Sequence, residues 1–200
     1  MTIHPTLDQV VIDLNNQQVT TSQTHTDGRV NSIKDEETII ETLRLLYGKG
    51  VETPKDREWF DVRLFGIPVQ IKSSSFSKSA PDNFSSKAAI LYSLTNLTEE
   101  EVTVRGWEKF EQSLLMNSED NNRDYYIIVM NKDNNEFHLT SLKRLNKLTP
   151  NGNNLPFQIK WKDNIKTVNR THDEAYRFIV GCYKESVTKK ISCHKLFDVL

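Results

Sequence analysis

The run Tyr-Tyr-Ile-Ile-Val-Met at residues 125–130 constrains the fold more than any other segment. Its residues are almost all apolar and favour extended structure, which predicts a β-strand that is covered on both faces. Residues 136–142 are expected to form a neighbouring strand. Because strands and helices alternate along the chain, the sequence predicts an α/β or α+β domain.

Four helices are predicted from apolar residues at helical spacing and from capping signals. They cover residues 35–47, 82–95, 98–116 and 171–187. The third is expected to begin at a capping box of Thr98 with Glu101, and the fourth at one of Thr171 with Glu174. Cys182 falls on the apolar side of the fourth helix, where we expect it to be a core residue.

The length of 200 residues indicates one domain, at most with a small appendage. Residues 1–27 are expected to form a polar N-terminal segment, in which a short opening stretch, Leu7 to Leu14, precedes a loop or mobile stretch at residues 15–27 that lacks periodicity. We place the single domain at residues 28–200. No apolar stretch reaches 18 residues and no secretory signal is present, so we expect no membrane association.

Two cysteines without C-x-x-C spacing argue against a disulfide scaffold or a zinc ribbon, and the expected compartment is the cytoplasm. The net charge of −1 hides an asymmetry. Residues 121–200 carry 14 Lys and Arg against 8 Asp and Glu, whereas residues 1–120 carry 12 against 19. The neutral sum is therefore compatible with nucleic-acid binding, although a chance distribution would look the same.

Residues 58–65 and 67–72 predict a β-hairpin around Gly66. If Gly66 and Ile67 form its two-residue loop, Asp61 lies opposite Lys72, and Arg63 lies opposite Gln70. One face then carries apolar residues and the other carries polar ones, because neighbours along a strand point to opposite sides. The apolar set is Val62, Leu64, Val69 and Ile71, and the polar set is Asp61, Arg63, Gln70 and Lys72.

The spacing of Asp61 from Gln70-Ile71-Lys72 resembles the signature of PD-(D/E)xK nucleases. Residues 27–32 and the following helix, with Glu36, Glu37 and Glu41, are similar to the turn and first helix of blunt-cutting type II restriction endonucleases. The resemblance covers about residues 27–96. It implies a central mixed β-sheet flanked by helices. Gln70 stands where the family usually has Asp or Glu, which leaves one fewer anionic metal ligand.

This resemblance implies site-specific, Mg²⁺-dependent hydrolysis of double-stranded DNA, in which Mn²⁺ can replace Mg²⁺ and Ca²⁺ binds without cleavage. Asp61, the Gln70 oxygen and the Ile71 carbonyl would hold the metal, and Lys72 would stabilise the developing negative charge. A helix glutamate would support the site, with Glu41 the first choice and Glu37 the alternative. The resemblance also implies a homodimer and a cognate DNA methyltransferase as genetic partner.

Residues 28–116 would form the catalytic half of such a nuclease, and residues 117–200 a basic, Asn-rich half that recognises DNA. Many of these asparagines also suit turns, which is the alternative explanation. A repair or recombination nuclease of the same fold, or a non-catalytic DNA-binding protein with a degenerate metal site, remain alternatives. The candidate DNA contacts are Asn31, Lys78, Asn122, Arg123, Asn134, Asn153, Asn154, Lys160, Lys162 and Arg170.

Overall fold

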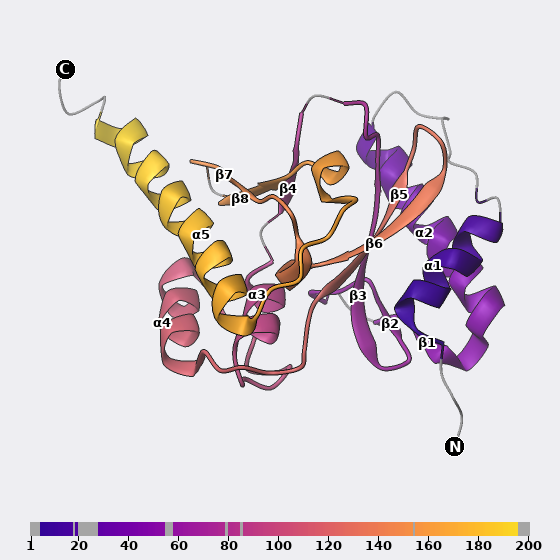
Figure 1. Cartoon of the computed structure of the whole chain (residues 1–200), viewed down its shortest axis with the longest axis horizontal. Coiled ribbons are helices and arrows are strands. Elements are labelled where there is room, and N and C mark those ends of the chain that lie inside the picture. The colour runs from indigo at the N-terminus through magenta and orange to yellow at the C-terminus, as the bar shows by residue number, and fades with distance from the viewer. Residues whose placement is uncertain are drawn as a thin grey trace. The chain divides into compact units, whose positions relative to one another are not determined.

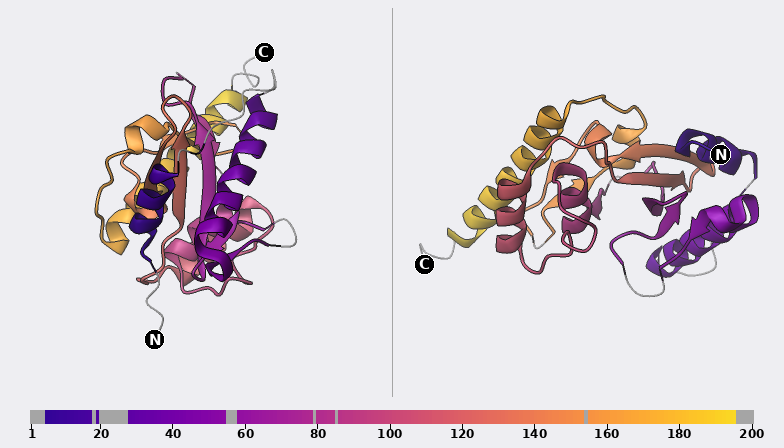
Figure 2. Two further views of the ribbon diagram at one scale, coloured as in Figure 1. Left: turned by 90° about the vertical axis from the view of Figure 1, so that its right-hand side faces the viewer. Right: turned by 90° about the horizontal axis from the view of Figure 1, so that it is seen from below.

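The computed structural model describes residues 5–17, 19, 28–54, 58–78, 80–84, 86–153 and 155–195. The chain divides into two compact units, and each is formed by two stretches of sequence. The first unit comprises Met1–Ser77 and Tyr125–Ser141, and the second comprises Lys78–Asp124 and Leu142–Leu200. Figures 1 and 2 show the elements of both units. A single nuclease domain from residue 28 to 200, divided after residue 116, stays a prediction.

The first unit contains a five-stranded sheet in the order β1-β2-β3-β5-β6. Strands β3 and β5 are parallel and the other pairs are antiparallel, so the sheet is mixed. Its residues 127–131 in β5 are all buried, as the apolar run predicts. The prediction of an α/β protein with a central mixed sheet and flanking helices is therefore confirmed. The strands are β1 Val51–Glu52, β2 Val62–Leu64, β3 Ile67–Ser74, β5 Tyr126–Asn131 and β6 Glu136–Ser141.

Two helices, α1 (Leu7–Asn16) and α2 (Gly28–Tyr47), pack against this sheet, and the short helix η1 (Gly48–Gly50) follows α2. The predicted loop over residues 15–27 is wrong for residues 15 and 16, which belong to α1, and the helix itself was not predicted. Residues 18 and 20–27 of that loop lie outside the described residues. Four apolar residues of α1 recur at helical spacing and are buried: Leu7, Val10, Val11 and Leu14. Helix α2 also begins earlier than residue 35, so residues 28–32 are helical and do not form the expected turn.

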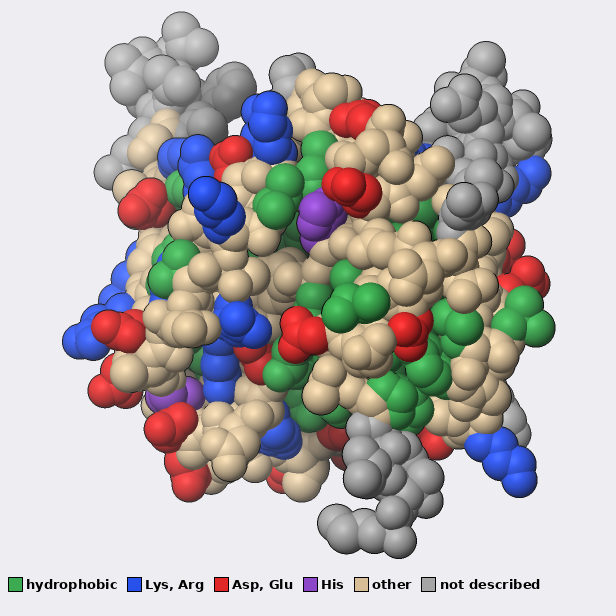
Figure 3. Space-filling view, turned by 45° about the vertical axis from the view of Figure 1, so that its right-hand side comes forward, with side chains coloured by type: hydrophobic (Ala, Val, Ile, Leu, Met, Phe, Trp, Pro, Cys, Tyr) green, Lys and Arg blue, Asp and Glu red, His purple; other side chains and the backbone are tan. Residues whose placement is uncertain are grey.

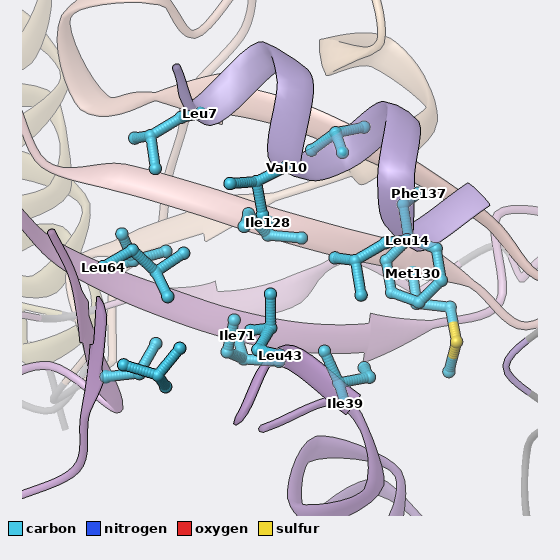
Figure 4. Packing of buried hydrophobic residues seen from close by; sticks show 14 of the residues in the cluster. Leu7, Val10, Leu14, Ile39, Leu43, Leu64, Ile71, Ile128, Met130 and Phe137 are labelled. Atoms are coloured by element: carbon cyan, nitrogen blue, oxygen red, sulfur yellow. The ribbon is translucent and has the colours of Figure 1, made fainter. Parts of the chain in front are cut away.

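The core of the first unit lies where α1 and α2 meet the sheet. Figure 4 shows Val10 and Leu14 of α1, and Ile39 and Leu43 of α2, gathered around strand residues that include Ile71. Ile39 and Leu43 have no exposed surface, and neither has Ile71. The face of α2 that carries Ile39 and Leu43 is therefore the face that lies against the sheet.

The hairpin of β2 and β3 turns at Phe65 and Gly66, which both have positive φ, and not at Gly66 and Ile67. The predicted pairing is wrong by two residues, since Arg63 lies opposite Pro68 and Leu64 opposite Ile67. The predicted loop would make Pro68 close the turn, but proline has no N–H to donate there. A shift of two residues keeps each side chain on its face, because strands repeat every two residues.

The described residues of the second unit form a three-stranded antiparallel sheet in the order β4-β8-β7 and three α-helices. The predicted helix over residues 82–95 begins only at residue 87, because residues 82–84 pair with β8 and the Ser86 side chain caps the helix. The elements are β4 Asp82–Phe84, α3 Lys87–Leu94, α4 Trp107–Asn117, η2 Leu142–Arg144, β7 Thr149–Pro150, β8 Phe157–Ile159, η3 Trp161–Asn164 and α5 His172–Lys195.

The capping box of Thr98 and Glu101 forms its hydrogen bonds, but only a turn follows it, and α4 begins at Trp107. The predicted helix over residues 98–116 is thus wrong in its first part. Gly106 adopts a φ of +77°, which lies outside the helical range and separates the turn from α4. The capping box of Thr171 and Glu174 does open a helix, α5, and Cys182 is buried there as predicted.

Within the part of the chain that the structure describes, no helix is long and apolar enough to cross a membrane. Figure 3 shows one face of the molecule, on which Lys and Arg side chains are interspersed with Asp and Glu.

Candidate active site

Asp61 lies directly before β2 and is held against β3 by three hydrogen bonds. Its backbone N–H donates to the Val69 carbonyl at 3.1 Å, and its Oδ2 accepts from the backbone N–H of Ile71 at 2.8 Å. Oδ2 also accepts from the side-chain amide of Gln70. The carboxylate is therefore fixed beside β3 by the pairing of the hairpin itself.

Gln70 bridges Asp61 and a buried tyrosine. Its Nε2 donates to Asp61, while its Oε1 lies 2.9 Å from the hydroxyl of Tyr125. That hydroxyl also lies 2.8 Å from the backbone carbonyl of Trp59, and Tyr125 has no exposed surface. Asp61 thus neighbours Gln70 and not Lys72, contrary to the predicted pairing, because of the two-residue shift in the hairpin.

Lys72 forms an ion pair with Glu36 of α2, with 3.0 Å between Nζ and Oε1. The two side chains are partly buried, with 36% and 22% of their surface exposed. Ion pairs shielded from water in this way are less screened by salt than exposed ones. The structure therefore joins the lysine of the hairpin to an acidic residue that the sequence analysis did not choose.

A second ion pair lies next to the first along α2. Asp35, which is 1% exposed, accepts from Lys132 Nζ at 2.7 Å and from the Ser73 hydroxyl at 3.3 Å. Lys132 directly follows β5, and Ser73 belongs to β3. Consecutive acidic residues of one helix thus contact β3 and the residue that directly follows β5.

Glu41 and Glu37, the predicted supporting carboxylates, are exposed on α2. They line a pocket of about 410 Å³ together with Asp61, Glu36 and Glu58. Arg44 adds a positive charge to the same pocket. The pocket therefore brings all the predicted helix glutamates to one cavity beside Asp61, while only Glu36 among them contacts Lys72.

Burial raises the pKa of the Glu36 carboxyl above its usual value. The ion pair with Lys72 opposes this shift, and the charges of Asp61 and Asp35 add to it. Burial, together with the charge of Asp61, raises the pKa of the Tyr125 hydroxyl well above 10. Tyr125 therefore stays protonated at neutral pH and can donate a hydrogen bond, and Asp61 acts electrostatically on both neighbours.

The donor set of this pocket consists of hard oxygen ligands, which suit Mg²⁺. Among the described residues no group of three or more Asp, Glu, His or Cys is arranged to hold a metal ion. Protein sites for Mg²⁺ often supply only one or two carboxylates and leave the other positions to water and substrate phosphate. Asp61 and Glu36 fit that requirement, whereas Gln70 presents its nitrogen to Asp61.

Several candidate DNA contacts have partners within their own unit. Arg123 donates to the carbonyls of Leu97 and Thr95, and Arg170 to those of Lys143 and Leu145. The side chain of Asn134 bonds Glu136, that of Asn153 accepts from the backbone of Leu155, and Lys78 pairs with Asp82. These contacts favour the turn and packing explanations for these residues.

The remaining candidate DNA contacts differ in how far they are exposed. Asn122 and Lys162 are exposed and Lys160 is partly buried. Trp161, between the two lysines, is buried, and its ring nitrogen donates to Asp82 at 2.7 Å. Asn154 and the side chain of Asn31 lie outside the described residues. A DNA-binding role stays a prediction for every one of these residues.

Sequence reasoning names Glu36 in the first helix without choosing it as a site residue, and it does not identify Asp35, Lys132 or Tyr125 as site residues. For the two acidic residues a signal existed, since Asp35 lies four residues before Ile39 and Glu36 lies seven before Leu43, which places both near the core face of α2. For Lys132 and Tyr125 no sequence signal existed, because their contacts depend on the parallel pairing of β3 with β5.

The sequence matches no protein-family model and no curated protein. Among solved structures, the chain is similar to "Restriction endonuclease in complex with substrate DNA", with 18% sequence identity and a TM-score of 0.33. The match covers 62% of this chain and 56% of that structure's chain.

Proposed function

We propose that this protein is a Mg²⁺-dependent endonuclease that cleaves double-stranded DNA at specific sites, as type II restriction enzymes do. One observation carries the proposal. A single hairpin fixes Asp61 beside an acidic pocket and holds Lys72 in an ion pair with Glu36 of α2. A fixed carboxylate and a fixed ammonium group next to a cavity are the groups that metal-assisted phosphodiester hydrolysis requires.

Each residue has a role that follows from its position. Asp61 and Glu36 would hold Mg²⁺, which when bound lowers the pKa of its water and polarises the phosphate. The ion pair with Glu36 holds the Lys72 ammonium in place, so that it can stabilise negative charge that develops on a phosphate. Glu37 and Glu41 line the same pocket at exposed positions and would orient water or substrate.

A repair or recombination nuclease would use the same groups without site specificity. One observation favours a different class, a DNA-binding protein without catalysis. The Gln70 amide nitrogen, and not its oxygen, faces Asp61. A carboxylate that already accepts two N–H groups on one oxygen is partly neutralised, which reduces its attraction for a cation.

Incubation of phage DNA with the protein and Mg²⁺ separates these functions. Discrete fragments are expected, whereas a smear would indicate a general nuclease and intact DNA with retained binding would indicate the non-catalytic class. Mn²⁺ should support cleavage, and Ca²⁺ should support binding alone.

The Asp61→Ala variant tests whether this site performs the cleavage. We expect cleavage to be abolished, because the fixed carboxylate beside the pocket is lost, while DNA binding in Ca²⁺ is retained. Asp8→Ala, which removes an exposed carboxylate of α1, is the matched control and should cleave normally. Cleavage by Asp61→Ala above a few per cent of the parent rate would mean that the active site lies elsewhere.

A further inference from the structure

The Tyr125 hydroxyl occupies a position from which it can either donate to Gln70 or accept from it. It lies 2.9 Å from Gln70 Oε1 and 2.8 Å from the Trp59 carbonyl oxygen. Its single hydrogen can therefore be directed to one of two acceptors. Tyr125 has no exposed surface, and its hydroxyl finds its hydrogen-bond partners in Gln70 and Trp59 without solvent.

We propose that Tyr125 is a positioning residue that allows Gln70 to turn its amide, so that Asp61 faces a nitrogen in the absence of a cation and an oxygen in its presence. The inference rests on the proposed function, because it concerns the metal ligands of the same site. It also accounts for an amide at a position where the resemblance implies a carboxylate.

Without a cation, the orientation in the structure is the one that electrostatics favours. The Gln70 oxygen would repel the Asp61 carboxylate, whereas its nitrogen donates a hydrogen bond to it. Tyr125 then donates to the Gln70 oxygen. Asp61, Gln70 and Tyr125 then each have a hydrogen-bond partner. The amide hydrogens of Gln70 take the place of a positive charge beside Asp61.

With a cation beside Asp61, the Gln70 oxygen must face it, and the amide nitrogen then points to Tyr125. A hydroxyl can accept this N–H while it donates its own hydrogen to the Trp59 carbonyl. The turned amide therefore also has a full set of partners. Tyrosine is suited to this position because its hydroxyl serves both orientations, whereas phenylalanine would serve neither.

Tyr125→Phe should therefore weaken cation binding. The turned amide would leave an N–H without an acceptor, whereas the unturned amide would leave only its oxygen without the tyrosine donor. An unpaired N–H is tolerated less well than an under-satisfied carbonyl oxygen, so the difference should weaken cation binding by up to about tenfold. The measurement is Mn²⁺ binding to the protein without DNA, followed by the electron paramagnetic resonance signal of free Mn²⁺. Tyr47→Phe removes another tyrosine hydroxyl of the first unit, one that bonds Asp13, and is the matched control. It should leave Mn²⁺ binding unchanged.

Gln70→Glu distinguishes positioning from a general structural effect. A carboxylate has no N–H that needs an acceptor, so Tyr125→Phe should not weaken Mn²⁺ binding when it is combined with Gln70→Glu. The single variant Gln70→Glu should bind Mn²⁺ more tightly than the parent, because it adds a negative charge. Equal weakening by Tyr125→Phe in both backgrounds, or none in either, would overturn the inference while leaving the proposed function intact. Failure of the parent protein to bind Mn²⁺ would overturn both.

A second measurement does not depend on the folding of Tyr125→Phe. The side-chain amide of Gln70 can be assigned in a ¹⁵N correlation spectrum as the signal that is missing from Gln70→Glu. Addition of Mg²⁺ should shift this signal and slow the exchange of one of its hydrogens, since that hydrogen moves to a fully buried oxygen. An amide signal that stays unchanged at Mg²⁺ saturation would show that Gln70 does not turn.

Discussion

At the scale of single residues, the polar face of the hairpin could be predicted and its contacts could not. Alternation places Asp61 and Gln70 on the polar side in either register, since the two registers differ by two residues. The contact between them depends on where the turn lies. Pro68 contains that information, because a residue without an N–H cannot close a two-residue turn.

The position of each glutamate on α2 decides which of them supports the site. Glu41 is exposed, whereas Glu36 points toward the sheet and pairs with Lys72. Periodicity measured from the fully buried Ile39 and Leu43 would have favoured Glu36. The sequence therefore contains a signal for Glu36, because helical phase places Glu36 near the buried face and Glu41 away from it.

We expect Glu36→Gln to slow DNA cleavage by more than the roughly 10–100-fold that is usual for groups that only orient a metal ligand, because Glu36 would itself hold Mg²⁺. Without the charge of Glu36, the Lys72 ammonium loses the partner that fixes it and the pocket loses a carboxylate. Single-turnover cleavage at saturating Mg²⁺ measures the effect. Glu41→Gln removes the same charge from an exposed position of the same pocket without breaking the ion pair with Lys72, and should slow cleavage less than Glu36→Gln does. A larger loss in Glu41→Gln than in Glu36→Gln would restore the sequence-based choice.

At the scale of elements, most of the longer segments could be predicted, with α1 as an exception, whereas the short strands of the second unit could not. Most of α2 and α5 follows from apolar residues at helical spacing, and β5 follows from an apolar run that is buried. The position of β6 also agrees with the prediction. The strands β4, β7 and β8 have only two or three residues each, and β4 pairs with β8 about 75 residues away. Such pairing is decided by tertiary contacts that local propensity does not contain.

The two capping boxes offer a comparison of identical chemistry in different settings. Thr171→Ala should destabilise the protein by about 1 kcal/mol, because it uncaps the long helix α5. Thr98→Ala removes the same hydrogen bonds from a turn that no helix follows directly, and should cost less. Urea denaturation of both variants measures the difference. Equal losses in the free energy of unfolding would mean that capping α5 stabilises the protein no more than the same hydrogen bonds do in a turn.

The charge of Glu174 makes the same cap dependent on pH. Hydrogen bonds from Thr171 hold the pKa of the Glu174 carboxyl below its usual value of 4.5. A carboxyl whose pKa is lower in the folded state stabilises the fold above 4.5, and this contribution is lost as the pH falls through the lowered value. Glu174→Gln keeps an acceptor but loses the charge. It should therefore be less stable than the parent at pH 7 and approach it at low pH, and a deficit that does not change with pH would contradict this.

At the scale of the whole molecule, the charge distribution is compatible with DNA as a partner but does not identify which residues would bind it. The asymmetry of charge along the chain is compatible with a DNA-binding half, but several of its basic residues have internal partners. Arg123 and Arg170 bond backbone carbonyls and lie over the rings of Tyr92 and Phe178. Sequence alone does not separate such structural cations from those available to phosphates, because both contribute equally to net charge.

Lys160 and Lys162 are the candidates whose contribution to DNA binding can be measured most directly. If both contact phosphates, their combined replacement by Ala should lower the slope of log affinity against log salt by up to about two units, roughly one per lost contact. Specific and random DNA should be weakened alike, because phosphate contacts carry no sequence information. Titrations at four salt concentrations in Ca²⁺ provide the slopes. Lys109→Ala with Lys184→Ala removes the same charge from exposed positions of α4 and α5, and separates a local contact from a general change in net charge. Identical slopes for both double variants would exclude a phosphate contact by Lys160 and Lys162.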